Sequence, residues 1–296
     1  MSETTLDQPA LGDWRDYLAL CKLRVVSLIV FTAVIGMFLA PGAPASWLVY
    51  AASSLGIGLA ACSAAAINHV AEHRIDALMA RTRNRPLPQG GLSRIHALIF
   101  ALLLALTSMT LLVVFSNTLT AILTFLSLIG YAVIYTMYLK YATPQNIVIG
   151  GAAGAAPPVL GWTAITGSLD PHSLLLFLII FAWTPPHFWA LAIYRRDDYA
   201  SAKIPMLPVT HGVDYTRQQI LLYTILLFVI AMLPYATYMA GEVYLVGASV
   251  LNLGFLYYAV RMQFDHDDQL AFETFKFSIP YLFGIFALLL LDRYWI

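Results

Sequence analysis

Long apolar runs alternate with short polar segments along almost the whole chain. Each run holds about 20 residues, which is the length of helix that crosses a hydrocarbon core roughly 30 Å thick. The pattern therefore predicts membrane-spanning helices. The nine predicted spans cover residues 24–40, 46–67, 95–115, 119–139, 146–165, 173–193, 218–238, 243–261 and 274–291. We expect an all-α, polytopic membrane protein.

The composition agrees with this interpretation. Of the 296 residues, 60% are hydrophobic and only 11% are charged, and the mean hydropathy is +0.76, which excludes an ordinary soluble globular protein. Little sequence is left for a second domain, so we expect one intramembrane domain over residues 1–296. Residues 1–20 form its N-terminal cytoplasmic segment. This segment is polar and lacks the apolar stretch of a cleavable signal peptide, so the first span is expected to direct insertion.

The basic residues are divided very unequally between the two sides of the membrane. With nine spans, 15 of the 16 Lys and Arg residues fall on one side and only Arg293 falls on the other. Because basic residues concentrate on the cytoplasmic side, we expect the N-terminus inside and the C-terminus outside. The two long polar loops, residues 68–94 and 194–217, then both face the cytoplasm.

The first long loop begins with three oxygen-bearing side chains at helical spacing. Asn68, Glu72 and Asp76 are four residues apart, so on a helix they line one face. Such a face suits Mg²⁺, which prefers one or two carboxylates together with phosphate oxygens. Polar groups at membrane depth are costly and are usually functional. We therefore predict that these three residues hold a metal.

Arginines and prolines follow this acidic face directly. Arg81, Arg83 and Arg85 carry the forked guanidinium donors that suit phosphate oxygens, and Pro86 and Pro88 are expected to end the helix. Acids for a metal followed by arginines for an anion indicate a metal and diphosphate site. A solvated loop in which the acids and arginines pair with one another is the plainer interpretation.

A second motif overlaps the same residues. His69, Glu72 and His73 match H-x-x-E-H, a zinc protease signature in which both histidines bind Zn²⁺ and the glutamate acts as general base. This interpretation leaves Asn68, Asp76 and the arginines unexplained.

The second long loop repeats the combination of acids, bases and prolines. Asp197 and Asp198 are adjacent, so on a helix only one of them can face a given metal, and we choose Asp198 because it lies four residues after Tyr194. Arg196 and Lys203 are the candidate diphosphate ligands of this loop. Charges that merely lie at the membrane interface are the alternative.

Two more segments carry candidate ligands. Lys140 and Asn146 lie at the cytoplasmic end of the fourth span, where they could add a cation and an amide to the anion site. The sixth span contains the sequence WTPPHFW at residues 183–189, in which two prolines should break the hydrogen-bond ladder. A lone buried histidine is usually a core residue, but His187 lies beside a proline kink and three aromatic rings and could itself contact a ligand.

Three stretches of the chain resemble the UbiA-type intramembrane prenyltransferases, and within them the branch that acts on haem. They are NHVAEHRIDALMARTRNRPLPQG at residues 68–90, LKYATPQNIVIGGAAGAAPPVLGW at 139–162 and WTPPHFWALAIYRRDDYASAKIPMLPV at 183–209. The resemblance implies nine helices around a central cavity that opens to lipid, with Mg²⁺ and a prenyl diphosphate at its cytoplasmic mouth. It covers nearly the whole chain.

The resemblance also implies roles for single residues. Asn68, Glu72 and Asp76 match the first acidic motif, and Asp198 matches the second, where Tyr194 replaces an expected aspartate. Asn68, Glu72, Asp76 and Asp198 are the predicted catalytic and metal-binding residues. The predicted diphosphate ligands are Arg81, Arg85, Lys140, Asn146, Arg196 and Lys203. The predicted haem or prenyl contacts are His73, Trp183, His187, Phe188, Trp189 and Tyr194.

The reaction implied by the resemblance is farnesyl transfer from farnesyl diphosphate to protoheme IX, giving haem O, with Mg²⁺ as cofactor. The implied location is the inner membrane, in contact with lipid, with a haem A synthase or a terminal oxidase assembly as protein partner and no nucleic acid. A prenyltransferase with a quinone or aromatic-acid acceptor, an intramembrane zinc protease and a secondary transporter are the alternatives.

Overall fold

The computed structural model describes residues 11–42, 45–79, 82–265 and 267–295, and within these ranges it contains helices and no strands. The helices are α1 (Trp14–Leu20), α2 (Leu23–Leu39), α3 (Trp47–Asp76), α4 (Arg94–Phe115), α5 (Thr118–Ile129), the π-helix η1 (Gly130–Leu139), α6 (Lys140–Ala142), α7 (Asn146–Ala155), α8 (Pro157–Thr166), α9 (Pro171–Tyr194), α10 (Arg196–Ser201), α11 (Leu207–Thr210), α12 (Val213–Ala236), α13 (Glu242–Phe264) and α14 (Asp268–Trp295).

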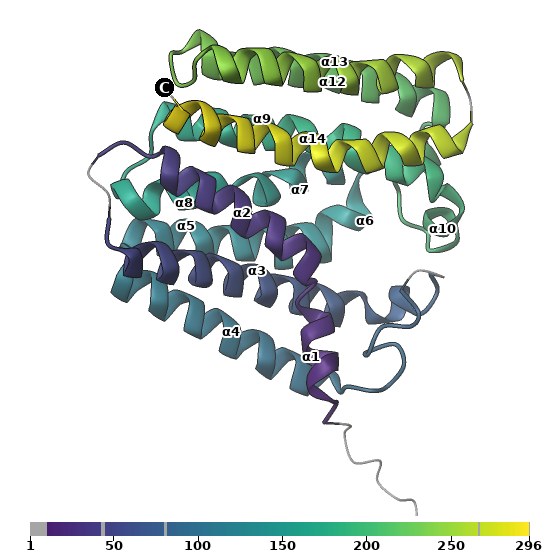
Figure 1. Ribbon diagram of the computed structural model, residues 1–296. Helices are drawn as coiled ribbons and strands as arrows, with labels where there is room; N and C mark the ends of the chain where they lie inside the picture. The colour runs from purple at the N-terminus through teal and green to yellow at the C-terminus, as the bar shows by residue number, and fades with distance from the viewer. Residues whose placement is uncertain (1–10, 43–44, 80–81, 266, 296) are drawn as a thin grey trace, which may run out of the picture.

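The described residues contain eight helical segments that are long and apolar enough to cross a membrane. A ninth is formed by α1 and α2 together, which are bent by 53° relative to each other. The predicted all-α, multi-pass architecture is therefore confirmed. In Figure 1 the long helices run side by side through the bundle, and the segment after α3 lies at the same end as α10, away from the C-terminus.

The interior of the bundle is apolar and centred on α9. This helix packs against α7, α12 and α14, while α3 packs against α4 and α2 packs against α8. Large side chains such as Ile179, Tyr244, Phe255 and Phe286 are fully buried there. Many leucines and valines on the outer helices are exposed, as expected for a surface that faces lipid.

Helices α2 and α8 approach each other closely because each carries a glycine at the contact. A Cβ atom on Gly36 would lie 2.2 Å from the Pro158 carbonyl oxygen, and one on Gly161 would lie 1.9 Å from that of Ala33. No side chain fits at either position. Small residues at such contacts are typical of membrane helices, whose association depends on close packing.

One expectation about prolines is wrong. The helix that carries the acidic face ends at Asp76, ten residues before Pro86, where the Ala77 N–H bonds back to the His73 and Ile75 carbonyls. Pro185 and Pro186 do interrupt the hydrogen-bond ladder, as expected, yet helix α9 continues through both to Tyr194. Each proline removes a backbone donor, but the neighbouring helices of a membrane bundle can support the helix on both sides of the gap.

Candidate active site

Asn68, Glu72 and Asp76 lie in the C-terminal part of α3 and are almost completely buried. Their exposed fractions are 3%, 5% and 2%. The Asn68 amide Nδ2 donates a hydrogen bond to Glu72 Oε1 at 2.7 Å, so the first two residues are in direct contact along the helix face. Buried polar groups of this kind need partners, and their partners come from other elements.

Three cations surround this helix face. Lys140 Nζ lies 2.6 Å from Glu72 Oε1, and Arg85 lies 2.6 Å from Asp76 Oδ2. Lys22 Nζ donates to the third residue, at 2.6 Å from Asn68 Oδ1. We call these six side chains the polar cluster. Its three cations and two carboxylates leave one positive charge in excess, which suits an anionic ligand.

Lys22 is a part of the polar cluster that the sequence analysis missed. It stands between α1 and α2 with φ of 49° and ψ of 50°, a left-handed conformation that is uncommon outside glycine and often marks a functional position. The available signal in the sequence was its position as a basic residue at the cytoplasmic end of the first span.

The π-helix η1 contributes a second unforeseen contact. The Thr136 hydroxyl donates to the Tyr131 carbonyl at 2.9 Å and accepts from Asn68 Nδ2 at 3.2 Å. A π segment holds an extra residue per turn and is frequent at functional sites. Helix η1 leads directly into α6, whose first residue is Lys140.

Asp198 lies apart from the polar cluster in its contacts. It lies on α10, which the Arg195 position separates from α9, and its Oδ2 is 3.7 Å from Arg195. Tyr194 and Asp198 are therefore not on one continuous helix. Among the residues that the structure describes, no three His, Cys, Asp or Glu side chains form a group that could hold a metal by themselves.

The other predicted diphosphate ligands differ in their surroundings. Asn146 is fully buried at the start of α7, where its Nδ2 donates to the Thr143 carbonyl and its Oδ1 has no partner among the described residues. Arg196 lies near Asp197 and Asp268, and Lys203 is exposed in a left-handed conformation. Arg81 lies outside the described residues.

The histidines of the H-x-x-E-H motif are not arranged as a zinc site. His69 is buried, and both of its ring nitrogens have no partner in the described part of the chain. His73 Nδ1 lies 2.9 Å from the Val70 carbonyl, which fixes it as a donor, and Nε2 lies 3.5 Å from Arg94. Glu72 instead pairs with Lys140.

The aromatic residues of α9 divide between two faces. The Trp183 and His187 rings are stacked, with centroids 4.1 Å apart, on the face toward α14, and Phe188 is partly exposed beside them. Trp189 points the other way and packs edge-on against Tyr223 of α12. Tyr194 stacks on Phe272 of α14 at 4.6 Å. The rings of Trp183, His187 and Tyr194 therefore all lie against α14.

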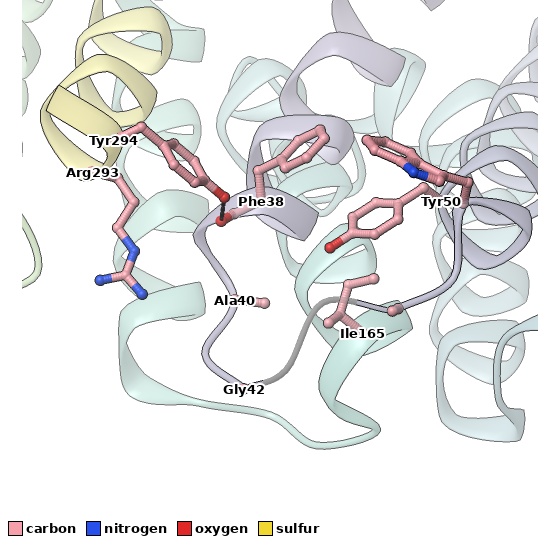
Figure 2. Close-up of a pocket in the computed structure, with 9 residues that line it drawn as sticks. Phe38, Ala40, Gly42, Tyr50, Ile165, Arg293 and Tyr294 are labelled. Carbon is pink, nitrogen blue, oxygen red and sulfur yellow. Dashed lines mark hydrogen bonds between the residues drawn. The ribbon is translucent and has the colours of Figure 1, made fainter.

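A cavity of about 500 Å³ opens far from the polar cluster, where α2 ends and α3 begins. Figure 2 shows Arg293 and Tyr294 of α14 on one side of it and Tyr50 on the other, with the Tyr294 hydroxyl donating to the Phe38 carbonyl. None of the predicted site residues lines this cavity. Its tyrosine and tryptophan residues are typical of a membrane interface.

The fold and the polar cluster are those expected of one class of intramembrane enzyme. Residues 29–284 match the model of the UbiA prenyltransferase family, and the chain belongs to this family. It is 60% identical to the protoheme IX farnesyltransferase of Methylococcus capsulatus, in an alignment that covers 99% of each chain.

Solved structures show the same fold. One, from a study of digeranylgeranylglyceryl phosphate synthase in membranes, has a TM-score of 0.80 and 17% identity, and the match covers 95% of this chain and 99% of that chain. A UbiA homologue from Archaeoglobus fulgidus bound to DMAPP and Mg²⁺ has a TM-score of 0.69 and 16% identity, with 93% and 99% covered.

Proposed function

We propose that this protein transfers the farnesyl group of farnesyl diphosphate to a vinyl group of protoheme IX, giving haem O and diphosphate. The observation that carries the proposal is the 60% identity, over nearly the full length of both chains, to a protoheme IX farnesyltransferase. The positive excess of the polar cluster supports the anionic donor substrate.

The residues of the polar cluster fit a magnesium ion. Glu72 and Asp76 are buried carboxylates one helical turn apart, and the Asn68 amide oxygen lies beside them. Mg²⁺ binds through one or two carboxylates when phosphate oxygens supply the rest, so a larger group of acids is not required. Bound there, Mg²⁺ would supply positive charge to the leaving diphosphate. Asp198 is the proposed fourth residue, contributed from α10.

The cations of the polar cluster act on the diphosphate directly. Arg85 and Lys140 can turn from their carboxylate partners to phosphate oxygens and, with Lys22, stabilise the negative charge that grows as the allylic C–O bond breaks. The other proposed diphosphate contacts are Arg81, Asn146, Arg196 and Lys203. The vinyl carbon of haem then takes up the allylic cation, and water adds to the resulting haem-side cation and loses a proton to solvent.

The aromatic residues on the α14 side of α9 are the proposed surface for the apolar parts of both substrates. Trp183 and Phe188 present π-faces that can shield an allylic cation. Toward the cytoplasmic loop the surface continues through Tyr194 and Phe272, and Arg195 and Lys276 lie 5.2 Å and 5.0 Å from these two rings. Flat aromatic faces beside cations suit a porphyrin that carries propionates. His73 and Trp189 are the other proposed haem or prenyl contacts; His73 lies beside Arg94, and Trp189 packs against Tyr223.

We further propose that the polar cluster faces the cytoplasm from the inner membrane, since 15 of 16 basic residues fall on that side of the nine spans. A membrane-impermeant thiol reagent should then label Arg293→Cys, but not Arg94→Cys, from the periplasm of intact cells. The reverse labelling pattern would refute this orientation. A haem A synthase or a terminal oxidase assembly is the proposed recipient of the product.

Incubating the purified protein with Mg²⁺, farnesyl diphosphate and haem tests the activity. We expect mass spectrometry to detect a farnesylated, hydroxylated haem. The absence of this product from folded protein would refute the proposal. Prenylation of a quinone precursor or an aromatic acid in place of haem would point to the related prenyltransferases that share the diphosphate site.

Substitution of Lys22 tests a residue that only the structure identifies. We expect Lys22→Met to raise the KM for farnesyl diphosphate by about tenfold, because a hydrogen bond to a charged group contributes about 1.5–3 kcal/mol. The KM for haem should not change. Arg24→Met is the matched control, since Arg24 is an exposed base two residues away. Equal KM values for the two variants would contradict a role for Lys22 in binding the donor.

A further inference from the structure

His187 and Ser278 form a buried pair that no step of the proposed reaction uses. They lie on α9 and α14, with exposed fractions of 8% and 0%, and the His187 Nδ1 and Ser278 Oγ atoms are 2.5 Å apart. A short hydrogen bond between two membrane helices, deep in an apolar core, fixes the histidine ring relative to the neighbouring helix.

The second contact of the serine decides which atom of this pair carries the proton. The Ser278 hydroxyl also lies 2.6 Å from the Phe275 carbonyl oxygen, which can only accept. The single hydroxyl proton is therefore used on Phe275, and Ser278 Oγ must accept from His187. It follows that Nδ1 of the histidine carries a proton and that Nε2 of the neutral ring has a free lone pair.

Aromatic residues fix the orientation of the His187 ring. Trp183 stacks on it with an interplanar angle of 20°, and Phe275 packs against it at a centroid distance of 4.7 Å. Trp183 is itself fixed, because its Nε1 donates to the Ser278 carbonyl at 2.8 Å. One residue of α14 thus positions both the histidine and the ring stacked on it.

Nε2 is left available to a ligand. It has no hydrogen-bond partner among the described residues. It is also not fully enclosed by them, whereas both ring nitrogens of His69 are enclosed and without a partner. A neutral imidazole whose other nitrogen donates to a fixed acceptor is the usual form of a histidine that binds a metal.

We propose that His187 Nε2 is the axial ligand of the haem iron and that Ser278 is a positioning residue that keeps this nitrogen unprotonated and correctly oriented. The proposal rests on the proposed function, because it takes haem as the acceptor. Iron held at His187 lets the porphyrin lie against the aromatic surface of α9 and α14, with its propionates near Arg195 and Lys276.

Haem titration of purified protein, without farnesyl diphosphate, tests the ligand. We expect the wild type to give the Soret spectrum of histidine-ligated haem and His187→Ala to lose it. Ser278→Ala should bind haem about tenfold more weakly, since loss of a residue that orients a metal ligand typically costs 10–100-fold in affinity. Ser278→Thr keeps the hydroxyl and should restore affinity. Neither serine variant should alter the KM for farnesyl diphosphate.

Ser54→Ala is the matched control, because the Ser54 hydroxyl also bonds to a backbone carbonyl of its own helix but contacts no histidine. A wild-type spectrum from His187→Ala overturns the assignment of the ligand. Equal haem affinity in Ser278→Ala and Ser54→Ala overturns the positioning role, and does so even when His187→Ala does not fold.

The same proteins separate this inference from the proposed activity. Wild type that binds haem through His187 but forms no farnesylated haem refutes the activity and leaves the ligand in place. Wild type that forms the product while His187→Ala binds haem unchanged refutes the ligand alone.

Discussion

Asp76→Asn is expected to lower kcat for farnesyl transfer by about 10²- to 10³-fold, the effect of removing one preorganised electrostatic group from an active site. Asparagine keeps the shape of the side chain but removes the negative charge that Arg85 contacts at 2.6 Å and that a metal would share. Because the carboxylate is 2% exposed, water cannot replace it. The measurement is single-turnover formation of farnesylated haem at saturating substrate.

Asp267→Asn is the control for this change. The Asp267 side chain is exposed and accepts the Gln269 N–H at the start of α14, and asparagine can accept the same bond. Loss of one partner from a buried ion pair can cost about 3–5 kcal/mol in stability, so the thermal unfolding of both variants must be compared. Wild-type turnover by folded Asp76→Asn would rule out the proposed role of the polar cluster.

Removal of divalent metal is expected to reduce turnover at least about 100-fold, because the positive charge that a metal adds to the leaving diphosphate would be lost. Mg²⁺ added back should restore it. Haem binding and the unfolding temperature should change little, since Glu72 and Asp76 already have cationic partners without metal. Full turnover in the presence of a chelator, with no metal found by elemental analysis, would contradict the proposed cofactor.

Local patterns predicted much of this protein. The nine spans follow from runs of apolar residues, and the shared face of Asn68, Glu72 and Asp76 follows from helical spacing alone. Both features depend only on the sequence within a single helix. The continuation of α9 past Pro185 and Pro186 could not be predicted in the same way, since packing around α9 supports a helix that its own sequence would interrupt.

Contacts between distant segments could not be predicted in this way. Lys22 is 46 residues from Asn68, and Thr136 is 68 residues from it. These contacts depend on how α2, α3 and η1 pack, and no spacing within one segment encodes that packing. The π-helix is equally hidden, because its residues are as apolar as those of any membrane span. Ser278 is not part of any motif in the sequence, and its proposed role follows only from its contact with His187 in the structure.

The pairing of both cluster carboxylates with cations also determines how the enzyme is loaded. Unpaired ions in a low-dielectric interior would oppose folding, so the resting pairs let the protein insert and fold before substrate arrives. Under the proposed function, binding of Mg²⁺ and diphosphate would then be an exchange of counter-ions rather than the burial of new charge. One Mg²⁺ and a fully ionised diphosphate together carry a small negative excess, which offsets the single positive charge of the polar cluster. With one metal ion the six side chains of the polar cluster, Mg²⁺ and the diphosphate would together be close to electroneutral, and a second metal ion would leave this set positive.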